Sequence, residues 1–141
     1  MIYLASHAHE KETVASVLSA NFSRVFDFAR FNEMQTQCID SVLSTSDNLV
    51  VGAPTGSGKT ALFELAMIRQ VLMNEREAVP PQKHKIFYVA PMKAIASERL
   101  RDWRVRLGRI GLKFLEVTGD TIFGSPSEFT RSVARSDVIL T

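Results

Sequence analysis

Eight residues near the middle of the chain combine features that suit phosphate chemistry. The segment APTGSGKT, residues 53–60, follows an apolar run and precedes an apolar helical pattern. Gly56 and Gly58 allow backbone N–H groups to turn inward as an anion-binding nest. A helix that begins near Lys59 adds the positive end of its dipole. The pattern therefore predicts a cradle for the phosphates of a nucleotide.

Two residues at the end of this loop have specific expected roles. Lys59 is expected to reach the β and γ phosphates of ATP, and the Thr60 hydroxyl is expected to hold Mg²⁺. These two residues are the predicted catalytic pair, and Thr60 is the predicted metal ligand. The nucleotide-binding residues expected from the loop are Ala53, Pro54, Thr55, Gly56, Ser57, Gly58, Lys59 and Thr60. The alternative is a glycine turn in a core, with an exposed lysine.

The elements beside the loop follow from hydrophobic periodicity. A strand is expected over residues 48–53 and a buried helix over about 59–73. Asn32 is typical of an N-cap for a helix over about 33–43. The apolar face expected for that helix consists of Met34, Cys38 and Val42. A short amphipathic helix is expected over 9–19 and an irregular aromatic stretch over 21–31.

Strands and helices also alternate in the second half of the chain. A polar loop over 74–85 precedes the expected strands 85–91, 112–117 and 136–141, with a helix over about 93–107 and a short helix before the last strand. Such alternation predicts right-handed βαβ units and a parallel sheet flanked by helices. The fold class expected is α/β, of the P-loop NTPase type.

Composition limits the remaining possibilities. The chain has 141 residues, of which 45% are hydrophobic and 23% charged, as in ordinary globular proteins. Cys38 is the only cysteine, which excludes an internal disulfide and favours a reducing compartment. Neither a signal peptide nor an apolar run of membrane-spanning length is evident, so an intracellular protein without membrane contact is expected. Residues 83–113 carry nine basic and two acidic residues, which suggests a polyanion-facing segment.

With the loop placed, several segments resemble the motifs of superfamily-2 helicases. APTGSGKT resembles motif I, FNEMQ the adenine-reading Q-type motif, VAPMKAIASER motif Ia, TGD residues of the motif Ib region, and SDVILT the strand before TPEKWD. The combination most resembles the DExH helicases of the superkiller-like group, and within it the branch that promotes meiotic crossovers. The resemblance covers residues 25–141 and implies a first RecA-like ATP-binding domain, with residues 1–24 as an N-terminal extension.

The resemblance implies further site residues. Gln35 would pair with the adenine edge, and Phe28 or Phe31 would flank the base, although core packing is the alternative for both aromatics. The single-stranded nucleic acid would lie against Pro91, Met92, Lys93, Ala94, Thr118, Gly119 and Asp120. Most arginines of the basic segment are expected to be solvated, and Trp103 is expected in the core.

The resemblance also implies the cofactors ATP and Mg²⁺, a nuclear location, DNA as the favoured nucleic acid and 3′ to 5′ movement. No DExH motif or arginine finger precedes Thr141, so the domain is expected to be truncated and its own ATP hydrolysis negligible. Glu116 is a poor substitute for the missing acid, because Lys113 interrupts its apolar run. The alternatives are an RNA helicase fragment, a different P-loop enzyme such as a small-molecule kinase, and a non-catalytic nucleotide-binding or nucleic-acid-binding module.

Overall fold

A computed structural model describes residues 12–76, 84–121 and 124–141 of the chain. Its residues form two compact units, Met1–Arg76 and Glu77–Thr141. The expected loop over 74–85 and part of the first expected helix, residues 9–11, lie largely or wholly outside the described residues. No helix within the described ranges is long and apolar enough to cross a membrane.

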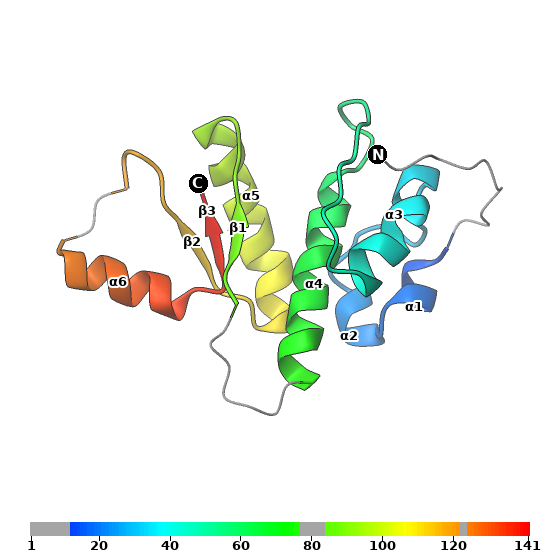
Figure 1. Ribbon diagram of the computed structural model, residues 1–141, viewed down its shortest axis with the longest axis horizontal. Coiled ribbons are helices and arrows are strands. Elements are labelled where there is room, and N and C mark those ends of the chain that lie inside the picture. Colours follow the sequence, from blue (N-terminus) through cyan, green and yellow to red (C-terminus); the bar gives the residue numbers. More distant parts are fainter. Residues whose placement is uncertain (1–11, 77–83, 122–123) are drawn as a thin grey trace. The chain divides into compact units, whose positions relative to one another are not determined.

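The first unit is helical. Its elements are α1 (Val14–Val17), α2 (Ala20–Ser23), α3 (Glu33–Ser44) and α4 (Thr60–Arg76). Helices α3 and α4 pack against each other, and the phosphate loop leads directly into α4 (Figure 1). The N-cap prediction at Asn32 is confirmed, because its side chain accepts a hydrogen bond from the Gln35 N–H and Gln35 accepts one from the Asn32 N–H.

Two predictions for the elements beside the phosphate loop are wrong. Residues 48–53 carry no strand, because a strand requires a hydrogen-bonded neighbour and no described segment pairs its backbone with them. Val50 is accordingly 89% exposed. Helix α4 is buried on one side only, since Phe63 and Met73 are exposed while Leu65 and Ile68 are fully buried.

The apolar face of α3 is also shifted from the prediction. The buried side chains are Gln35, Ile39 and Val42, at steps of four and three residues. Cys38 is only half-buried, and that burial raises the pKa of its thiol.

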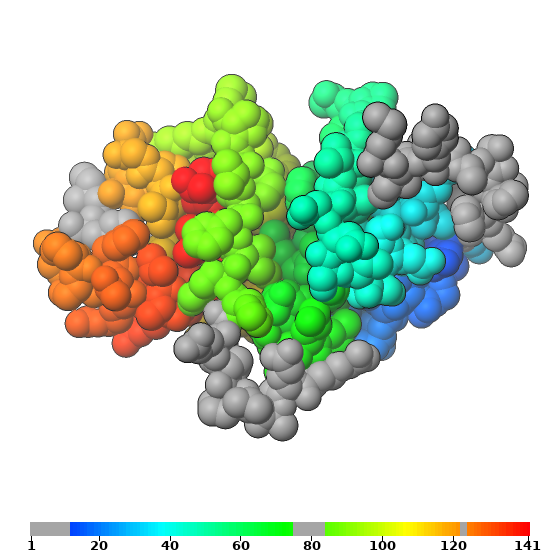
Figure 2. Space-filling view, in the orientation of Figure 1, coloured from blue at the N-terminus to red at the C-terminus, as the bar shows by residue number. Residues whose placement is uncertain are grey.

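The second unit contains the expected parallel sheet. Its elements are β1 (Ile86–Tyr88), α5 (Lys93–Arg106), the 3₁₀ turn η1 (Leu107–Ile110), β2 (Phe114–Glu116), α6 (Pro126–Arg135) and β3 (Val138–Leu140). The strand order is β1-β3-β2, with Phe87 and Leu115 both paired to Ile139. Helix α5 packs on one face of this sheet (Figure 1). In the space-filling view, the red C-terminal residues lie between the segments of β1 and β2 (Figure 2).

The core of the second unit lies between α5 and the sheet. Trp103 is fully buried, as expected, and packs edge-on against Tyr88 with ring centroids 4.8 Å apart. Its other aromatic neighbour is Phe114 of β2, at 6.4 Å. The turn after α5 ends at Gly111, whose φ of +88° lies in the left-handed region that favours glycine. The sheet and this turn therefore fix the position of α5.

Candidate functional site

The phosphate loop has the geometry of an anion nest at the start of α4. Gly56 and Gly58 adopt positive φ values of 79° and 81°, which other residues rarely adopt. Within the described chain, no acceptor takes a hydrogen bond from the backbone N–H groups of Gly56, Gly58, Lys59 or Thr60. These four donors stand at the N-terminus of a 17-residue helix, whose dipole favours negative charge there.

Lys59 folds back onto the start of its own loop. Its ammonium group donates to the carbonyl oxygens of Ala53, at 2.5 Å, and Pro54, at 2.7 Å. Both acceptors are uncharged, and Pro54 is exposed to solvent. A phosphate oxygen is a stronger acceptor for an ammonium group than a neutral carbonyl, so an incoming phosphate can replace these contacts.

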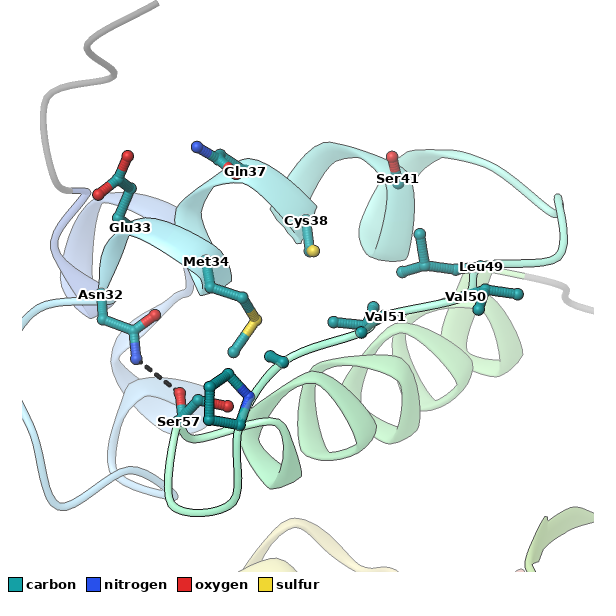
Figure 3. Close-up of a pocket in the computed structure, with 13 residues that line it drawn as sticks. Asn32, Glu33, Met34, Gln37, Cys38, Ser41, Leu49, Val50, Val51 and Ser57 are labelled. Carbon is teal, nitrogen blue, oxygen red and sulfur yellow. Dashed lines mark hydrogen bonds between the residues drawn. The ribbon is translucent and has the colours of Figure 1, made fainter. Parts of the chain in front are cut away.

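Gln35 contacts the loop from the side of α3. The residue is 4% exposed, and its side-chain amide donates to the carbonyl oxygen of Gly58 at 2.9 Å. Asn32 donates in the same way to the carbonyl oxygen of Ser57, also at 2.9 Å (Figure 3). The structure therefore brings both Gln35, which the resemblance assigned to the adenine edge, and Asn32, for which the sequence predicted only a helix cap, to the phosphate loop.

A hollow of about 610 Å³ opens beside these contacts. Its walls are α3 on one side and residues 49–54 with Ser57 on the other, and Met34 and Cys38 are directed from α3 toward that second wall (Figure 3). Gln35 does not line this hollow, because its side chain is turned to the loop. Its expected contact with adenine therefore stays a prediction.

The aromatic residues expected to flank a base belong to a cluster. Phe31 is fully buried and packs against Phe26 and Phe28, with centroid separations of 5.7 Å and 5.5 Å. Phe28 is half-buried and lies 5.2 Å from Phe26. The structure thus places Phe31 in the core, which agrees with the alternative given for it.

In the second unit, both segments expected to touch nucleic acid follow the carboxyl ends of strands. Residues 91–94 follow β1 and are exposed, and residues 118–120 follow β2. The carboxyl ends of parallel strands share one edge of a sheet, so the segments meet there. The ammonium group of Lys93 forms an ion pair with the carboxylate of Asp120. The hydrogen bond and charge of Lys93 lower the pKa of Asp120.

Helix α5 begins at this edge without a side-chain cap. Met92 occupies the N-cap position and makes no side-chain hydrogen bond to the helix. The Ile95 N–H donates to the Met92 carbonyl, whereas the N–H groups of Lys93 and Ala94 have no acceptor within the described chain and are available to an external anion. Farther along, Arg106 forms a two-point ion pair with Asp102, whose pKa it lowers, and Arg104 donates to the Phe114 carbonyl. Part of the basic segment thus makes contacts within the second unit, one along α5 and one to β2.

A signal for the role of Asn32 exists in the sequence. A hydroxyl or carboxylate at the N-cap and a glutamate three residues later satisfy a helix start. Here both positions are amides, Asn32 and Gln35, and an amide offers a donor as well as an acceptor. The helix start uses only the acceptor oxygen of each amide. The N–H donors of the two amides are therefore free to bind a partner outside the helix.

Comparison with known proteins finds a matching family model and several similar sequences. A family model described as DEAD/DEAH box helicase matches residues 32–141. An "ATP-dependent DNA helicase MER3 homolog" of Oryza sativa subsp. japonica is 43% identical over 124 residues, covering 85% of this chain and 10% of that protein. The Mus musculus "Probable ATP-dependent DNA helicase HFM1" is 38% identical over 125 residues, 88% of this chain and 8% of its own length.

An RNA helicase is similar to a comparable degree. The Arabidopsis thaliana "DExH-box ATP-dependent RNA helicase DExH13" is 44% identical over 97 residues, which cover 68% of this chain and 4% of that protein. The chain thus spans a tenth or less of the length of these three relatives.

Proposed function

This chain belongs to the DEAD/DEAH box helicase family, and from that premise we propose that residues 53–60 bind the phosphates of ATP within an ATP-dependent DNA helicase. The observation that carries the proposal is the set of four backbone donors that lack acceptors within the described chain, beside Lys59. A nest of N–H groups, one ammonium group and a helix dipole together match a polyphosphate chain.

The remaining roles at this site follow from residue chemistry. Mg²⁺ is bound by hard oxygen ligands and keeps several waters, so the Thr60 hydroxyl fits as one ligand beside phosphate oxygens. Phosphate oxygens and water molecules would supply the other ligands of the ion. Gln35 retains one amide hydrogen and one lone pair for the adenine edge.

The proposal predicts that affinity depends on the phosphates rather than the base. ATP and inorganic triphosphate should both bind the chain about tenfold or more tightly than AMP, because AMP lacks the groups that Lys59 is proposed to reach. Isothermal titration of the four ligands ATP, ADP, AMP and triphosphate in Mg²⁺ buffer measures this order. Equal affinity for AMP and ATP would contradict the proposal.

The edge around Lys93 and Asp120 is proposed to bind the backbone of single-stranded nucleic acid. The supporting features are an exposed lysine, the uncapped start of α5 and the segments 91–94 and 118–120. DNA is favoured because two of the relatives are named as DNA helicases. RNA is the second candidate, because an RNA helicase is similarly close.

Asp120 competes with nucleic acid for Lys93. Replacing it in the variant Asp120→Asn should raise the affinity for a single-stranded oligonucleotide about two- to fivefold at low salt, the range of an exposed ion pair. Fluorescence anisotropy across a salt series measures this change. Lys93→Ala should weaken binding and lower the salt dependence by about one charge.

Asp40→Asn provides the matched control for this experiment. Asp40 is an exposed acid on α3, so its removal changes net charge equally without touching Lys93. Weaker binding by Asp120→Asn, or an equal gain in both variants, would show that Asp120 does not occupy the phosphate contact of Lys93.

The whole protein is proposed to move 3′ to 5′ along DNA in the nucleus during meiotic recombination. The support is the resemblance to the meiotic branch of DExH helicases together with the two DNA helicase relatives.

A further inference from the structure

Two side-chain amides connect the start of α3 to the phosphate loop. In each amide the oxygen serves the helix, since Asn32 Oδ1 accepts from the Gln35 N–H and Gln35 Oε1 accepts from the Asn32 N–H, both at 2.9 Å. In each, the nitrogen serves the loop, at the carbonyls of Ser57 and Gly58. Two neighbouring peptide groups are therefore held by α3.

Because peptide groups are planar, these two contacts also fix the directions of two backbone N–H groups in the loop. In a planar trans peptide, the carbonyl of one residue and the N–H of the next point in opposite directions. When Asn32 holds the Ser57 carbonyl, the N–H of Gly58 points away from it. When Gln35 holds the Gly58 carbonyl, the N–H of Lys59 points away in turn. Both N–H groups belong to the four that lack an acceptor in the described chain.

We propose that Asn32, acting with Gln35, is a positioning residue that sets the phosphate loop in its binding conformation before nucleotide arrives. This inference rests on the proposed function of residues 53–60. In this proposal Asn32 does not contact phosphate. It acts on phosphate binding through its hydrogen bond to the Ser57 carbonyl.

The amides of Asn32 and Gln35 lie close to Gly58 of the phosphate loop. A Cβ atom at position 58 would stand 2.5 Å from Gln35 Nε2 and 3.3 Å from Asn32 Nδ2, so only glycine allows this approach. The Gln35 side chain is almost fully buried and therefore cannot move aside freely. A loop that is already held in its binding conformation loses less conformational entropy when phosphate binds.

The variant Asn32→Ser separates the two functions of this residue. Serine is about as good an N-cap as asparagine, so α3 keeps its start, but its hydroxyl is too short to replace the amide donor to Ser57. We expect affinity for inorganic triphosphate to fall about three- to tenfold, the range of one lost hydrogen bond, with helix content unchanged by circular dichroism. ATP affinity should fall by the same factor, because the loss does not involve the base.

A second variant protects this test against a folding defect. Asn32→Asp is a strong cap beside the helix dipole, and it places an acceptor against the Ser57 carbonyl. It should weaken triphosphate binding at least as much as Asn32→Ser. Gln37→Ala is the matched control, because this amide lies on the same helix and lines the hollow without a hydrogen bond to the loop among the described contacts. It should bind like wild type.

The outcomes are distinguishable. Wild-type affinity for triphosphate in both Asn32 variants would overturn the positioning role while leaving the proposed function intact. A loss restricted to ATP would also overturn it, since that pattern indicates contact with the base. A wild-type chain that binds no triphosphate would contradict the proposed function itself.

Discussion

Replacing Lys59 with alanine should weaken ATP binding about 10- to 100-fold, the range of a lost charge-assisted hydrogen bond. In the structure the ammonium group is already poised at the loop, where it donates to the carbonyls of Ala53 and Pro54. In the variant those carbonyls can accept hydrogen bonds from water instead. The substitution should therefore weaken ATP binding rather than the stability of the fold. Fluorescence of a labelled ATP analogue measures the affinity, and thermal denaturation should show little change.

The control for Lys59 is another lysine with the same charge. Lys113 is exposed, and its backbone rather than its side chain makes the hydrogen bond to Asp137. Lys113→Ala should bind ATP within about twofold of wild type, because an exposed charge outside the loop is screened at physiological salt. If Lys113→Ala lost as much affinity as Lys59→Ala, general charge rather than the loop would be responsible.

Local chemistry explains which parts of the structure could be predicted from sequence. The helix cap at Asn32, the glycines of the loop and the boundaries of α5 each depend on a few neighbouring residues. The three short strands of the second unit are apolar runs bounded by turn residues, and their parallel pairing follows from the helices between them. These features therefore appeared where the sequence placed them.

Contacts between distant segments could not be predicted in this way. Residues 48–53 have the composition of a strand, but composition does not supply a pairing partner. The burial of Gln35 depends on Gly58, which lies 23 residues farther along the chain. Likewise, the ion pair of Lys93 with Asp120 requires that β1 and β2 flank the same strand, and the sequence pattern did not specify that order.

Removing the Trp103 side chain should destabilise the second unit by about 3–5 kcal/mol, the range for a large aromatic residue in a core. Trp103 is fully buried and joins α5 to β1 through Tyr88 and to β2 through Phe114. Because it is the only tryptophan, its loss removes the natural fluorescence signal, and urea unfolding must be followed by circular dichroism. Val105→Ala is the control on the same helix, since Val105 is 60% exposed and should cost about 0.5 kcal/mol or less.

The effect of Trp103→Ala should extend to nucleic acid binding. Lys93 begins the helix that Trp103 anchors, and Asp120 follows the strand that carries Phe114. A loss of several kcal/mol is a large share of the stability of an ordinary domain, about 5–15 kcal/mol, so the relative position of these two segments should loosen. Oligonucleotide affinity should therefore fall in Trp103→Ala and stay unchanged in Val105→Ala. If a destabilised Trp103→Ala variant kept its oligonucleotide affinity, nucleic acid binding would not depend on the edge formed by β1 and β2.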